Sequence, residues 1–238
     1  MTVTAMSDAA TTGLPATRLV WDLPLRLTHW ALALAVAGCF ATHYAGIEWF
    51  TWHRRCGYAV LVLAAFRVLW GIVGTRHARF ANFMRGPNAV LQYLRGRAAR
   101  PVGHNPLGAL SVLAMLALLL LQAGTGLFAN DEIMSMGPFY GWIDPQLSNR
   151  ITSLHRNSSD MLLVLVAMHV AAIAWYALVR REQLVPPMLT GRKPAAEVPA
   201  GEAIDRSRTL LAVAIAAVLA TALALAVRAA PEATIALY

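Results

Sequence analysis

The segment HRNSSDMLLVLVAMH, residues 155–169, places two histidines inside one long, predominantly apolar run. The two histidines are fourteen residues apart, which is close to four turns of an α-helix, so both imidazoles fall on nearly the same helix face. Along the axis they are separated by about 21 Å. Because histidine is costly within lipid and usually marks a functional site there, the segment predicts a membrane helix with two functional levels.

The same interval recurs in two earlier apolar runs. One of them carries His53 and Arg67, and another carries His29 and His43. Polar levels about 20 Å apart on several facing helices indicate two cofactors stacked across a membrane.

Composition agrees with a membrane protein. The chain of 238 residues is 58% hydrophobic and 13% charged, and its mean hydropathy is +0.54, whereas soluble domains contain about 25% charged residues. The net charge of +8 comes from basic residues that cluster in particular loops, so no nucleic-acid partner is expected. Cys39 and Cys56 form no CxxC motif, which argues against a covalently attached haem or a cysteine-ligated cluster.

Five apolar runs are long enough to cross a bilayer, which takes about 20 residues. The sequence therefore predicts an all-α integral membrane fold. The expected spans are Leu27 to Ile47, His53 to Val73, Pro106 to Phe128, Ile151 to Val179 and Thr209 to Ala229.

Loop charges predict the orientation of these spans. Fourteen of the twenty Lys and Arg residues lie in segments that share one side, and the positive-inside rule places that side in the cytoplasm. The N-terminus is then cytoplasmic and the C-terminus lies outside. Residues 1–17 are polar and lack the features of a cleaved signal, so we expect a loose cytoplasmic tail. The cytoplasmic segment 79–97 mixes aromatic residues with arginines, and either a short interfacial helix or an ordinary loop fits it.

Orientation assigns a depth to each candidate side chain. The inner level, near the cytoplasm, holds His29, His169 and Arg67. The outer level holds His53 and His155, with His43 as a further candidate for that level. Two separate levels suit two b-type haems, because each iron takes two axial ligands and neutral imidazole is a common one. We therefore expect His29, His53, His155 and His169 to be haem ligands.

Haem propionates are anionic and favour arginine nearby. Arg67 can serve them at the inner level, and Arg54 at the outer level with Arg55 and Arg156. Small residues allow helices to approach a flat macrocycle closely. Five glycines have suitable positions: Gly38, Gly57, Gly71, Gly124 and Gly126.

Other functions fit the sequence less well. A tetrahedral zinc site needs three or four clustered ligands, which the separation between His155 and His169 prevents. A proton or ion transporter would use carboxylates within the membrane, and Asp160 is the only one inside a span. His43 lies near the outer interface, where water reaches it, and is not an expected ligand. His104, in the loop before the third span, could cap a helix, contact headgroups or line a quinone site.

The chain resembles the bacterial cytochrome b561 family, which includes the cytochrome b subunits of nickel–iron hydrogenases. The resemblance covers about residues 20–193 and rests on the order and spacing of several segments. These are VWDLPLRLTHW (20–30), WHRRCGYAVLVLAAFRVLWGIVG (52–74), RFANFMRGP (79–87), GHNPLGAL (103–110), LQAGTGLF (121–128), the pair His155 and His169, and MLTGRK (188–193).

The resemblance implies a four-helix bundle that holds two b-type haems, with histidines from the first, second and fourth helices as ligands. His29, His53, His155 and His169 take those positions. The domains expected on this basis are a cytoplasmic tail (1–17), a di-haem cytochrome b domain (18–193), and a linker with a fifth transmembrane helix (194–238). The fifth helix has no ligand-type residue, so we expect it to pack or to contact a partner.

The expected function is relay of electrons between membrane quinone and a periplasmic redox partner at the bacterial inner membrane. Candidate partners are a hydrogenase small subunit, another dehydrogenase or a c-type cytochrome, which would dock on the acidic outer loop 130–150. The alternatives are a stand-alone quinone reductase that oxidises a species such as superoxide, and a membrane anchor without redox function. An anchor would not need histidines at two levels.

Overall fold

The computed structural model of the chain describes residues 16–97, 101–132 and 135–231. In the described part of the chain, five helices are long and apolar enough to cross a membrane. These are α1 (Leu23–Ala45), α2 (Phe50–Val73), α5 (Pro106–Gly126), α6 (Pro145–Leu178) and α8 (Thr209–Ala229). The five predicted spans and the all-α membrane fold are thereby confirmed.

Shorter elements occupy the connections between these helices. They are β1 (Thr17–Leu19), η1 (Ile47–Trp49), α3 (Phe80–Phe83), α4 (Pro87–Leu94), η2 (Tyr140–Trp142), α7 (Val185–Thr190), β2 (Arg192–Pro194), η3 (Ala195–Glu197) and η4 (Ala200–Glu202). The segment 79–97 thus contains two short helices, and Pro87 begins the second of them. The residues 1–15 of the expected tail lie outside the described residues.

Helix capping explains why two helices begin earlier than their apolar runs. Helix α1 begins at Leu23 rather than Leu27, because the Asp22 carboxylate accepts a hydrogen bond from the Leu25 backbone N–H. Helix α6 begins at Pro145 rather than Ile151, because Asp144 caps it and the polar residues that follow continue the helix. Hydropathy registers neither the cap at Asp22 nor the polar first turns of α6, so both predicted starts were wrong.

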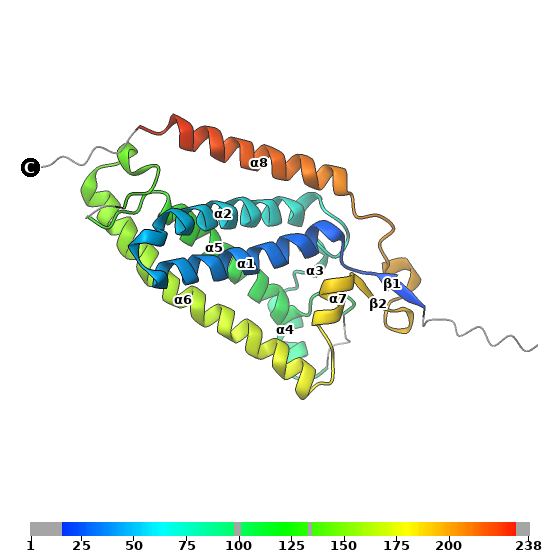
Figure 1. The fold of residues 1–238 in the computed structure, drawn as a ribbon. Coiled ribbons are helices and arrows are strands. Elements are labelled where there is room, and N and C mark those ends of the chain that lie inside the picture. The colour runs from blue at the N-terminus through cyan, green and yellow to red at the C-terminus, as the bar shows by residue number, and fades with distance from the viewer. Residues whose placement is uncertain (1–15, 98–100, 133–134, 232–238) are drawn as a thin grey trace, which may run out of the picture.

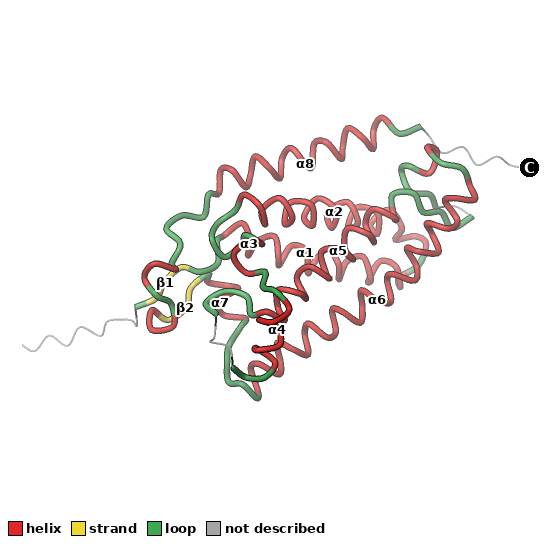
Figure 2. The backbone as a smooth tube through the Cα atoms, turned by 180° about the vertical axis from the view of Figure 1, so that it is seen from behind, coloured by secondary structure: helices red, strands yellow, loops and turns green. Residues whose placement is uncertain are grey.

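Helices α1, α2, α5 and α6 form a bundle, and α8 lies outside it along α2 (Figures 1 and 2). The backbone of α1 packs on α2, that of α2 on α5, and that of α5 on α6. Within the described residues, α6 has no extensive backbone contact with α1 or α2. The bundle is therefore closely packed on one side, while α6 faces α1 and α2 mainly through side chains.

All the segments rich in basic residues lie at one end of the bundle, with β1, β2, α3, α4 and α7 (Figure 1). We call this the basic end. Strand β1 pairs with β2 in antiparallel register, so that Thr17 lies opposite Pro194. Each strand of this pair crosses one of the predicted domain limits, between residues 17 and 18 and between residues 193 and 194. The domain limits themselves stay a prediction.

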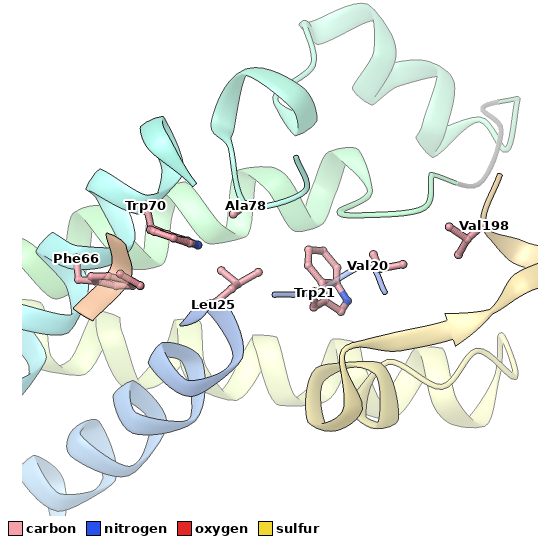
Figure 3. Close-up of a cluster of buried hydrophobic side chains, with 8 residues drawn as sticks. Val20, Trp21, Leu25, Phe66, Trp70, Ala78 and Val198 are labelled. Carbon is pink, nitrogen blue, oxygen red and sulfur yellow. The ribbon is translucent and has the colours of Figure 1, made fainter. Parts of the chain in front are cut away.

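Two hydrophobic clusters hold the bundle together. One lies at the basic end, where Trp21, Leu25 and Trp70 pack with residues from the loops and α8 (Figure 3). The other lies between α2, α5 and α6 and consists of Val60, Ala64, Leu116, Leu118, Leu119, Ala123 and Leu162. Between them, the two clusters fix the helices that carry the candidate histidines.

Candidate functional site

His29 and His169 meet near the basic end of the bundle, and we call them the inner pair. His29 lies on α1 and His169 on α6, with ring centroids 6.3 Å apart and ring planes at 53°. Nδ1 of His29 is buried and has no hydrogen-bond partner among the described residues. Two helices without extensive backbone contact thus present imidazoles to each other at the level that the sequence predicts.

His53 and His155 meet near the opposite end, and we call them the outer pair. Their ring centroids are 6.4 Å apart, and the ring planes are nearly perpendicular. Nδ1 of His53 lies 2.9 Å from the Cys39 carbonyl oxygen, and Nδ1 of His155 lies 2.9 Å from the Gln122 carbonyl oxygen. An Nδ1–H that donates to a carbonyl leaves Nε2 with its lone pair, which is the state of a metal-binding imidazole.

Both separations fit an iron atom between the rings. A bond from a metal to an imidazole nitrogen is about 2 Å long, and the nitrogen lies about 1 Å from the ring centroid, so two axial histidines have centroids about 6 Å apart. At both levels the histidines come from helices that, among the described residues, lack extensive backbone contact with each other, since α6 packs its backbone on α5 and not on α1 or α2. The residues present therefore fit a haem at each pair.

His43 also lies close to the outer pair, with its ring centroid 6.2 Å from that of His53. The distance to His53 therefore does not decide whether His43 or His155 is its partner at this level. However, the His43 side chain is exposed, whereas His155 is half-buried and held by the Gln122 carbonyl. The better anchored ring favours His155 as the partner of His53.

The two candidate arginines differ in burial. Arg67 on α2 is only 6% exposed, and both terminal nitrogens lack a hydrogen-bond partner among the described residues. Its guanidinium carbon lies 5.2 Å from the centre of the Phe80 ring. Arg54 is half-buried, and its guanidinium carbon lies 5.9 Å from the centre of the Phe50 ring. Because buried donors without hydrogen-bond partners are costly, the open donors of Arg67 fit an anionic group such as a haem propionate.

The glycines divide into two groups. Close packing explains three of them, since an added Cβ would meet Cys56 at Gly38, Phe80 at Gly71 and His155 at Gly126. The same atom at Gly57 or Gly124 would meet nothing within 4 Å. The space beside Gly57 and Gly124 is therefore compatible with the predicted role beside a macrocycle, which stays a prediction. Contacts within the protein account for Gly38 and Gly71, and Gly126 packs against the candidate ligand His155.

Replacement of Gly126 by alanine should disturb the outer pair. The new Cβ would lie 3.0 Å from Cε1 of His155, so the ring must move by a few tenths of an ångström. Overpacking of this kind costs about 1–3 kcal/mol. We expect weaker haem retention at the outer site, measured as faster haem release on heating.

The matched control for this prediction is Gly86→Ala, at a position with φ −65° and open space around the new atom. Equal haem release in the two variants would contradict the role of Gly126.

His104 lies at the basic end inside an aromatic cage. Its ring centroid is 4.8 Å from that of Trp21 and 4.5 Å from that of Phe83, and its buried Nδ1 has no partner among the described residues. Burial, with the nearby charge of Arg67, lowers its pKa to about 3. Burial also lowers the pKa of His77, whose Nε2 lies 2.7 Å from the Glu202 carbonyl oxygen. His104 is therefore neutral at pH 7 and available as a hydrogen-bonding group.

This lowered pKa predicts a loss of stability in acid. The unfolded chain takes up a proton on His104 below its ordinary pKa of 6.5, while the folded protein does not do so until about pH 3. Stability should therefore fall as the pH drops below 6.5, by up to about 1.4 kcal/mol per pH unit from this residue. Thermal unfolding of His104→Gln in detergent, from pH 7.5 to 5, should show a smaller loss than wild type.

Replacement of the exposed His43 by glutamine is the control for this measurement. A slope of stability against pH that is the same in His104→Gln and wild type would contradict the assignment.

A zinc site has no support from the geometry. Within residues 16–97, 101–132 and 135–231, no group of three or more His, Cys, Asp or Glu side chains is placed to hold a metal ion. Two histidines at each level match axial ligands of a haem better than a tetrahedral metal shell.

Comparison with known proteins adds to this geometry. The sequence profile of the family described as "Prokaryotic cytochrome b561" matches residues 20–191. The chain belongs to this family. Membership identifies it as a multi-pass bacterial membrane cytochrome that holds b-type haem and takes part in electron transfer.

Several curated relatives of this cytochrome carry the name "Probable Ni/Fe-hydrogenase B-type cytochrome subunit". The relative from Azotobacter chroococcum mcd 1 is 25% identical, and the match covers 72% of this chain and 86% of that protein. The relative from Cupriavidus necator is 27% identical, with 72% and 85% covered. The relative from Rhizobium leguminosarum bv. viciae is 25% identical, with 73% and 87% covered.

Three groups around the sites of this cytochrome were not predicted from the sequence. The Gln122 and Cys39 carbonyls that hold the outer histidines are backbone atoms, and no residue pattern marks them. Asp22 at the basic end is buried and bonded to Trp70 and Thr75. The sequence Asp22-Leu23-Pro24 is typical of a helix N-cap followed by an early proline, so the capping role of Asp22 could have been predicted. Its bonds to Trp70 and Thr75 could not.

Proposed function

We propose that this cytochrome relays electrons between membrane quinone and a redox partner at the periplasmic face, through two b-type haems. The inner haem is held by His29 and His169, and the outer haem by His53 and His155. The observation that carries this proposal is the pair of imidazole contacts, 6.3 Å and 6.4 Å between centroids, near the two ends of one bundle.

Each part of the chain has a distinct role in this proposal. Bound b-type haem supplies a one-electron couple. The four histidines fix its position, and the carbonyls behind His53 and His155 set the ring orientation. Arg67 at the inner site and Arg54 at the outer site balance the propionate charge. The apolar helices around the sites exclude water, which tunes the potentials.

The quinone site is proposed at the basic end, next to the inner pair. His104 and Arg67 both present unpartnered donors or acceptors there, inside a wall of aromatic side chains. Such a mixture of apolar walls and a few polar groups is typical of small-molecule sites. With the basic end in the cytoplasm, as the loop charges favour, this site faces the inner leaflet.

The partner is proposed to dock on the loop between α5 and α6, at the end of the bundle where the outer pair lies. Asn130 orders this loop, since its side chain donates to Ser148 and Asn149 and its backbone N–H donates to Thr152. Trp142, half exposed, stacks on Phe139 within this loop. The names of the relatives support a hydrogenase as the partner.

The proposal is tested with purified protein in liposomes that contain a short-chain quinone. Reduced benzyl viologen, added outside, stands in for the partner. We expect sustained dye oxidation above the background rate of empty liposomes only when both the protein and the quinone are present. Dye oxidation at the same rate without the quinone would contradict the proposed relay. In a second assay, superoxide replaces the dye as the electron donor. Quinone reduction that is faster with superoxide than with the dye would contradict the relay too.

A further inference from the structure

Asp22 is a buried carboxylate at the basic end whose bonds join two helices. It is 0% exposed. Its oxygens accept hydrogen bonds from the Leu25 backbone N–H at 2.7 Å, from Trp70 Nε1 at 3.1 and 3.2 Å, and from the Thr75 hydroxyl. Leu25 belongs to α1, Trp70 to α2, and Thr75 to the loop that follows α2.

Helix capping alone does not explain this arrangement. Asn105 and Asp144 cap α5 and α6, and as caps each accepts one backbone N–H, from Gly108 and Leu147 respectively. The Asp144 side chain is exposed. Asp22 differs because it is fully buried and because its further bonds reach α2. A buried charge is tolerated only with such complete hydrogen bonding.

The position of Asp22 connects it to the inner pair. His29 follows seven residues later, which places it on nearly the same face of α1 two turns further along. Trp70 follows Arg67 by three residues, about one turn of α2. Arg67 also lies within electrostatic reach of the Asp22 carboxylate. The bonds of Asp22 therefore fix the segments of α1 and α2 that carry His29 and Arg67.

We propose that Asp22 is a positioning residue for the inner haem: it holds α1 and α2 together at His29 and Arg67, and its charge lowers the haem potential. A nearby negative charge stabilises the oxidised, more positive iron. This inference rests on the proposed function, because it requires a haem at the inner pair.

The experiment compares purified wild type with Asp22→Asn, Asp22→Ala and the control Asp144→Asn. Haem content is measured per chain, and each haem is followed in a redox titration by optical spectra. Asparagine keeps an acceptor for the Leu25 N–H but removes the charge, so we expect two haems with a raised inner potential and an unchanged outer potential. Alanine removes the bonds as well, so we expect the haem content to fall from two towards one. Asp144→Asn should match wild type in both measurements.

Several results would overturn the inference. One is an unchanged inner potential in Asp22→Asn, and another is equal loss of both haems in Asp22→Ala. Failure of both Asp22 variants to accumulate, while Asp144→Asn does, would reduce Asp22 to a folding role and overturn it too. A wild-type protein with one haem would instead refute the proposed function, so the two failures are distinguishable.

Discussion

Purified His169→Ala protein is expected to contain one haem per chain instead of two, with the outer haem intact. The ring centroids of His169 and His29 are 6.3 Å apart, and removal of one ring would leave the proposed inner haem with one histidine to hold it. The outer pair uses a different part of α6, fourteen residues and about 21 Å away, so it should not respond. Haem content per chain and the reduced-minus-oxidised spectrum measure this loss.

The matched control is His43→Ala. His43 lies 6.2 Å from His53, yet its side chain is exposed and we expect two haems in this variant. Equal retention of both haems in His169→Ala would refute the role of His169. Loss of the outer haem in His43→Ala would transfer the ligand role from His155 to His43.

Replacement of His53 by alanine should abolish electron transfer between the two faces. We expect the variant to lose the proposed outer haem, so that no cofactor would carry electrons over the distance of about 20 Å between the outer and the inner level. Oxidation of reduced viologen in the liposome assay should fall to the background rate of empty liposomes. The inner haem should still be present and should still be reduced by added quinol.

Trp52→Phe controls for damage at this end of α2, because Trp52 precedes His53 and is 52% exposed. Its activity should stay close to that of wild type. Dye oxidation at the wild-type rate in His53→Ala would show that electrons bypass the outer pair, which contradicts the assignment of its function.

The two levels of histidines could be predicted because helical spacing and loop charge together set the depth of each residue. A fourteen-residue interval is almost a whole number of turns, and the basic loops orient every span in turn. The structure brings together His29 with His169 and His53 with His155. Their role as ligands stays a prediction.

Other features could not be predicted, for physical reasons. Hydropathy does not report the polar first turns of α6, which follow from the Asp144 cap. The carbonyls of Cys39 and Gln122 act through backbone geometry, which no side-chain pattern encodes. The contact between Asp22 and Trp70 joins residues 48 positions apart and depends on the packing of α1 against α2.

The central claim is tested most directly by a haem count on the purified wild-type protein, combined with a redox titration of its reduced-minus-oxidised spectrum. We predict two b-type haems per chain that titrate as two components. A single haem per chain, or a colourless protein, would contradict the account.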